Sequence, residues 1–63
     1  MNWVSIPDED LKVGDVVQVL GKKRITAIHP YDGPLKEIIF ARADTDIGVG
    51  FSLEIGGYTD VLR

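Results

Sequence analysis

The densest group of basic side chains in the chain is Lys22-Lys23-Arg24. Adjacent cations of this kind can hold the phosphates of RNA or DNA, and Arg42 is a further candidate for the same surface. The chain as a whole is acidic, with seven Lys and Arg against ten Asp and Glu and a net charge of −3. Proteins that bind nucleic acid usually carry a basic excess. We therefore expect a solvated hairpin tip whose lysines discourage edge pairing, with nucleic-acid binding as the alternative.

A second group, Asp44-x-Asp46-x-Gly48, is a fragment of a calcium-binding loop. A complete loop also requires a third early ligand and a bidentate Glu at position 12, where this chain has Ile55. The fragment therefore predicts a hairpin turn capped by Asp side chains, and no metal site.

The chain has one histidine, His29, and no cysteine. Neither Ser5 nor Ser52 lies in the sequence context of an activated nucleophile, and no glycine-rich phosphate loop occurs. We expect a protein without catalytic activity and without a cofactor.

Hydrophobic residues make up 44% of this short chain, which is more than a small core can cover. The excess predicts an exposed apolar patch of the kind that binds a protein. Small residues around Gly48, Gly50 and Ser52 leave room for close approach by another chain. The candidates for protein contact are Trp3, Ile47, Phe51 and Tyr58.

Short apolar runs, each ended by Gly, Pro or Asp, must position these residues. They predict a single all-β domain over residues 1–63, since helical spacing is not sustained. We expect five strands near residues 15–20, 24–29, 36–43, 49–53 and 58–62. An N-terminal entry segment precedes them, in which the acidic run 8–10 opens a helical turn.

The alternation of side chains along these strands predicts which residues face the core. Val17, Val19, Phe40 and Val61 are expected inside, and Val16 and Leu20 half-buried. Ile28 interrupts the alternation, which suggests a bulge near Ala27. Gly21 supplies the positive φ of the first hairpin, whose lysines stay wet.

The segments 11–19 (LKVGDVVQV) and 24–28 (RITAI) resemble the opening hairpin of SH3-like small barrels, a group that includes KOW and Tudor-type modules. The resemblance implies a five-stranded, strongly bent barrel with a binding role toward RNA, DNA, peptides or other subunits. In Tudor-type modules aromatic side chains form a cage for methylated cations, which would use Trp3, Tyr31 and Tyr58 here. We expect instead that Trp3 covers the barrel mouth and the tyrosines pack on loop edges. The small acidic chain also resembles accessory proteins of bacteriophages.

Together these features predict a non-catalytic module that docks on a protein partner or on itself. The alternatives are a nucleic-acid-binding module that uses the basic residues, and a permanent subunit of a larger assembly. The absence of cysteine and of any signal-like or membrane-spanning apolar run favours the cytoplasm.

Overall fold

The computed structural model describes all 63 residues and is an all-β structure, as expected. One 3-10 turn, η1 (Asp8–Asp10), forms at the acidic run where a helical turn was expected. No helical segment is long and apolar enough to cross a membrane. The six strands are β1 (Trp3–Pro7), β2 (Val16–Gln18), β3 (Lys22–Pro30), β4 (Ile39–Thr45), β5 (Phe51–Glu54) and β6 (Tyr58–Leu62).

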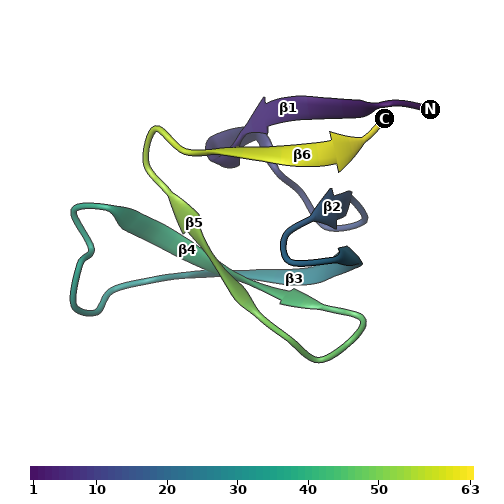
Figure 1. Cartoon of the computed structure of the whole chain (residues 1–63). Coiled ribbons are helices and arrows are strands. Elements are labelled where there is room, and N and C mark those ends of the chain that lie inside the picture. Colours follow the sequence, from purple (N-terminus) through teal and green to yellow (C-terminus); the bar gives the residue numbers. More distant parts are fainter.

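The strands form one antiparallel sheet in the order β1-β6-β2-β3-β4-β5. In Figure 1, β1, β6 and β2 lie on one side of the molecule and β3, β4 and β5 on the other. The prediction of a five-stranded barrel is wrong in two respects. The expected entry segment contains a sixth strand, because β1 pairs with β6 along its whole length. The sheet is also open, since no ladder joins its two edge strands β1 and β5.

The core lies between the two halves of the bent sheet and consists of seven hydrophobic residues. Val17 of β2 and Val61 of β6 are fully buried, as predicted, and they are direct cross-strand partners. Val19 is only half-buried and packs against the margin of the core. The core residues are Leu11, Val17, Ile25, Ala41, Ala43, Leu53 and Val61.

Phe40 was expected in the core, but the structure leaves it half-buried and buries Ala41 and Ala43 instead. The register of β4 against β5 shifts between Ile39 and Ala41, so that Phe40 lies in a bulge. A bulge inserts one residue and changes which side chains face inward. The bulge predicted near Ala27 is confirmed by a register shift between Ile25 and Ala27.

The first hairpin turns at residues 19–21, and Gly21 has the expected positive φ of 115°. Leu20 was expected half-buried but is fully exposed at the tip, with a φ of 51°. Lys23 was expected to be wet, yet it is only 5% exposed. It already belongs to β3, opposite Val17, and alternation directs it to the same side as the buried Ile25. The Lys23 ammonium forms no ion pair, and the structure contains no buried side-chain nitrogen without a partner. The ammonium therefore reaches the surface, while the aliphatic stem of Lys23 is buried.

The left-handed backbone of Leu20 generates a stability prediction. A non-glycine residue in this conformation costs about 1 kcal/mol, whereas Asn tolerates it. Because the Leu20 side chain buries nothing, Leu20→Asn should raise the free energy of unfolding by about 0.5–1 kcal/mol in urea denaturation. Val13→Asn is the matched control, since Val13 is also exposed but has no positive φ. Equal stability of the two variants would show that the Leu20 backbone carries no such cost.

Candidate functional site

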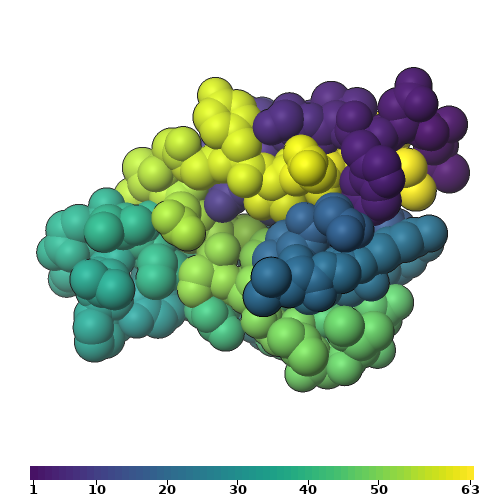
Figure 2. All heavy atoms as spheres, in the orientation of Figure 1, coloured from purple at the N-terminus to yellow at the C-terminus, as the bar shows by residue number.

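The main hollow of the molecule is a groove of about 460 Å³ between β5, β6 and the end of β2. Its volume falls within the range of ligand clefts in proteins. Figure 2 shows this face, where the yellow C-terminal strand, the yellow-green β5 and the blue β2 meet. Its nine lining residues are Asp8, Gln18, Val19, Phe51, Ser52, Glu54, Tyr58, Thr59 and Asp60.

The groove exists because β2 is shorter than its neighbour β6. The β2–β6 ladder has only two pairs, Val17 with Val61 and Gln18 with Asp60. Beyond them the chain turns away at Val19, while β6 continues paired with β1 alone as far as Tyr58. The side of β6 that β2 leaves uncovered is the wall of the groove opposite β5.

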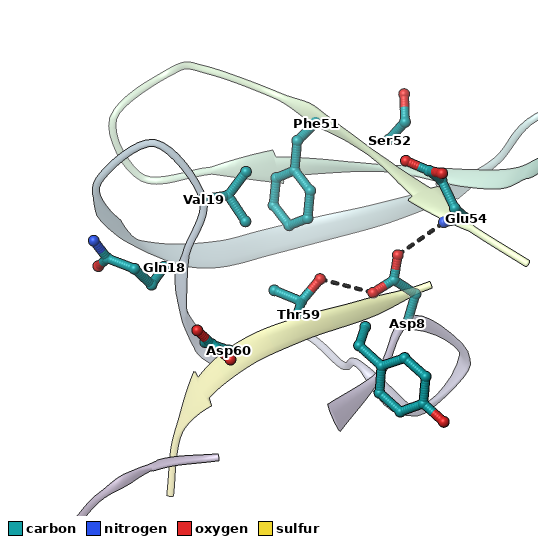
Figure 3. A pocket seen from close by; sticks show the side chains of 9 residues that line it. Asp8, Gln18, Val19, Phe51, Ser52, Glu54, Thr59 and Asp60 are labelled. Carbon is teal, nitrogen blue, oxygen red and sulfur yellow. Dashed lines mark hydrogen bonds between the residues drawn. The ribbon is translucent and has the colours of Figure 1, made fainter. Parts of the chain in front are cut away.

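The carboxylate of Asp8 holds β5 and β6 together at the turn end of the groove. Asp8 is 5% exposed. Its Oδ2 accepts a 2.9 Å hydrogen bond from the main-chain N–H of Glu54, and its Oδ1 accepts one of 2.7 Å from the hydroxyl of Thr59. Figure 3 shows both bonds. One side chain from η1 thus connects two strands that share no ladder.

The β5–β6 turn itself packs on η1. The main-chain N–H of Asp8 donates to the carbonyl of Gly57 at 2.9 Å. Glu9 Oε2 accepts a 3.2 Å bond from the N–H of Gly56. A Cβ on Gly57 would lie 2.9 Å from Asp8 Oδ2, so the close approach requires glycine.

The apolar surface of the groove comes from Val19 and Phe51. Both are half-buried and pack against the core. In Figure 3 the Phe51 ring lies beside Val19, while Ser52 points the opposite way from Phe51. The groove therefore has an apolar patch that is continuous with the core.

The charge of the groove is negative. Three carboxylates line it, from Asp8, Glu54 and Asp60, and no Lys or Arg does. Glu54 and Asp60 are exposed, and neither forms an ion pair, since the acidic partners in the three pairs of the structure are Asp15, Asp32 and Asp44. These two carboxylates stand on opposite strands and are available to a cation.

One basic side chain, that of Arg42, contacts a residue that lines the groove. Its Nη1 donates a 2.7 Å hydrogen bond to Ser52 Oγ. Ser52 and Arg42 are cross-strand partners, and both lie on the face opposite to the buried Leu53 and Ala43. The guanidinium thus lies on the outer face of β5, outside the groove.

The structure brings together only two of the four residues expected to contact a protein. Phe51 and Tyr58 both line the groove, and Tyr58 is 68% exposed. Trp3 pairs with Leu62, at the far end of the β1–β6 ladder from Tyr58. Ile47 is exposed in the β4–β5 turn, outside the groove.

The three aromatics of the cage alternative do not converge. Trp3 and Tyr58 are separated by four residues along the β1–β6 ladder, about 13 Å at the usual rise of a strand. The hydroxyl of Tyr31 donates to the carbonyl of Pro34 at 2.6 Å, within its own loop. Tyr31 therefore packs on a loop edge, as expected, but the same expectation is wrong for Tyr58, which lies in β6 and is 68% exposed.

Three of the four basic candidates, Lys22, Lys23 and Arg24, line one hollow of about 190 Å³ together with Val16 and Asp46, and Arg42 lies apart from them. Lys22 is exposed, whereas the stem of the neighbouring Lys23 is buried and only its ammonium reaches the surface. Arg24 Nη1 donates to the carbonyl of Gly14 at 2.9 Å. Arg42 lies on β4, where it is the cross-strand partner of His29.

The acidic residues near the β4–β5 turn make separate contacts. Asp44 Oδ2 lies 2.8 Å from Nε2 of the exposed His29. Asp46 Oδ1 accepts a 3.0 Å bond from the main-chain N–H of Arg24. Gly48, with a φ of 79°, forms the predicted turn.

Comparison of the chain with protein-family models, curated proteins and solved structures found no match. Sequence reasoning missed the acidic residues of this groove and Gln18. The run 8–10 was a signal for a helical turn only, and nothing near Asp8 in the sequence indicates its burial.

The role of Asp8 can be tested by unfolding. In Asp8→Ala two part-buried donors, the N–H of Glu54 and the hydroxyl of Thr59, lose their acceptor. We expect the free energy of unfolding in urea to fall by about 2–4 kcal/mol. Asp10→Ala, which removes an exposed carboxylate from the same turn, should change it by less than about 0.5 kcal/mol. Similar losses in both variants would contradict a bridging role for Asp8.

Proposed function

We propose that this chain is a non-catalytic protein-interaction module and that its binding site is the groove between β5 and β6. The observation that carries the proposal is an open cleft with an apolar patch, two unpaired carboxylates and an exposed tyrosine. Binding sites on proteins combine apolar surface with a few placed polar groups in this way.

Tyr58 is the residue of the groove best suited to carry binding energy. Tyrosine is enriched among residues that dominate protein interfaces, because it offers a large rigid surface and a polar end. Tyr58 lines the groove and is 68% exposed, so its ring is not part of the core. The apolar patch of Val19 and Phe51 would be covered on binding.

We further propose that the fold is a relative of the SH3-like small barrels, with β1 as an additional strand. Two features support this assignment: the opening hairpin at residues 11–28 and the strongly bent antiparallel sheet. A phage accessory protein and a cytoplasmic location are compatible with the small, acidic, cysteine-free chain.

Nucleic-acid binding is the competing function. It would use Lys22, Lys23, Arg24 and Arg42, but Arg24 already bonds the main-chain carbonyl of Gly14 and the stem of Lys23 is buried. The groove, in contrast, is acidic and would repel phosphates. These contacts favour a protein partner.

The proposal is tested by selecting random dodecapeptides on the immobilised protein and measuring their affinity by fluorescence anisotropy. Tyr58→Ala should weaken the selected peptides about tenfold, because it removes an exposed aromatic side chain of the groove.

Trp3→Ala and Ile47→Ala are matched controls, because both residues are exposed and lie outside the groove. They should leave the affinity unchanged. Failure to enrich any peptide would refute the proposal, and peptides sensitive to Trp3 or Ile47 rather than Tyr58 would place the site elsewhere. Salt-dependent binding of RNA or DNA that is lost in Lys22→Ala would favour the competing function.

A further inference from the structure

We infer that the occupant of the groove is an extended segment of a partner protein that carries Arg or Lys and adds as a strand along the free edge of β5. This inference rests on the proposed function and specifies the partner. Two independent features support it, the main-chain groups of β5 and the charge of the groove.

Two hydrogen bonds show to which side the main-chain N–H groups of β5 point. The N–H of Ile55 donates to the carbonyl of Ile38 at 2.7 Å, which directs it toward β4. The N–H of Glu54 points the other way and donates to Asp8. Because main-chain groups alternate along an antiparallel strand, the N–H and C=O of Ser52 point to the same side as the N–H of Glu54.

The main chain of Ser52 has no partner on that side. The only strand paired with β5 is β4. No hydrogen bond outside the ladders involves the N–H or C=O of Ser52, and Ser52 lines the groove. The edge strand therefore offers one unpaired donor and one unpaired acceptor beside an apolar patch. An extended peptide recognises an edge of this kind by adding a strand to the sheet.

The other edge of the sheet is less suited to such pairing. Asn2 and Arg63 exchange two main-chain hydrogen bonds, so they form a hydrogen-bonded pair next to the β1–β6 ladder. Because such pairs alternate along an antiparallel ladder, the main-chain groups of Trp3, Ser5 and Pro7 point away from β6. Pro7 has no N–H, and proline at an edge discourages pairing. β5 contains neither proline nor lysine, and Asp8 occupies it only at Glu54.

The charge of the groove specifies a cationic side chain in the added segment. Glu54 and Asp60 lie on opposite walls without ion pairs, and the buried carboxylate of Asp8 adds a third negative charge. Tyr58 lies in the same groove and can contact the face of a guanidinium. The net charge of −3 also attracts a basic segment from a distance.

The probe is a fluorescein-labelled hexapeptide of alternating Val and Arg, and its binding is measured by fluorescence anisotropy. Alternation places valines on one face of the strand and arginines on the other. The control peptide alternates Val and Glu and should not bind. A third peptide keeps the Val and Arg side chains but is methylated on every internal main-chain nitrogen. Because it cannot donate to Ser52, it should bind at least about tenfold more weakly.

The charge contribution is tested with Asp60→Lys, which should weaken the Val-Arg peptide about fivefold, as expected for an exposed pair. Glu37→Lys makes the same change of net charge at an exposed site outside the groove and is the matched control. Circular dichroism checks that both variants fold.

The outcomes separate this inference from the proposed function. Equal binding of the methylated and unmethylated peptides would overturn strand addition while leaving a groove site intact. Failure of the Val-Arg peptide to bind, while library peptides still depend on Tyr58, would overturn the basic occupant alone. Loss of all peptide binding would overturn both. Preference for an oligothymidine over the Val-Arg peptide would also overturn the inference.

Discussion

The Asp8 carboxylate is the contact on which the relation between β5 and β6 depends. It joins residues that lie 46 and 51 positions further along the chain. A buried carboxylate is costly unless its oxygens accept hydrogen bonds, and here both oxygens do. No ladder connects β5 to β6 or to β1. The two hydrogen bonds of Asp8 therefore join β5 to β6 at one end of the groove, and the other end of the groove stays open.

The small size of the chain explains why the groove has an apolar patch. A domain of 63 residues covers only part of its hydrophobic surface. In this structure the buried positions of β4 carry small side chains, Ala41, Ala43 and Thr45, which leave room for the two halves of the sheet to approach closely. Larger side chains such as Val19 and Phe51 are then left at the margin of the core. The apolar surface that the core does not cover therefore lies in the groove.

Burial and charge divide the acidic residues of the groove into two roles. Asp8 has its oxygens engaged by the protein itself and maintains the position of the strands. Glu54 and Asp60 are exposed and have no ion-pair partner, so no cation of the protein neutralises their charges. One buried carboxylate thus connects the two strands, and two exposed carboxylates add to the negative charge of the groove.

The sequence alone determined the all-β class, most strands, the turns, and the core positions Val17 and Val61. These features follow from signals that extend over a few residues: the alternation of apolar and polar side chains along a strand, and the Gly and Pro residues that form turns. It did not indicate β1, whose Trp3 and Val4 are exposed and whose pairing requires β6 from the other end of the chain. The bulge that displaces Phe40 likewise depends on the register with β5.

Only the tertiary structure decided that Asp8 is buried and that Glu54, Tyr58 and Asp60 share one groove. The physical reason is distance along the chain. The partners of Asp8 are brought to it by the folding of the whole sheet, and local signals in the sequence extend over only a few residues.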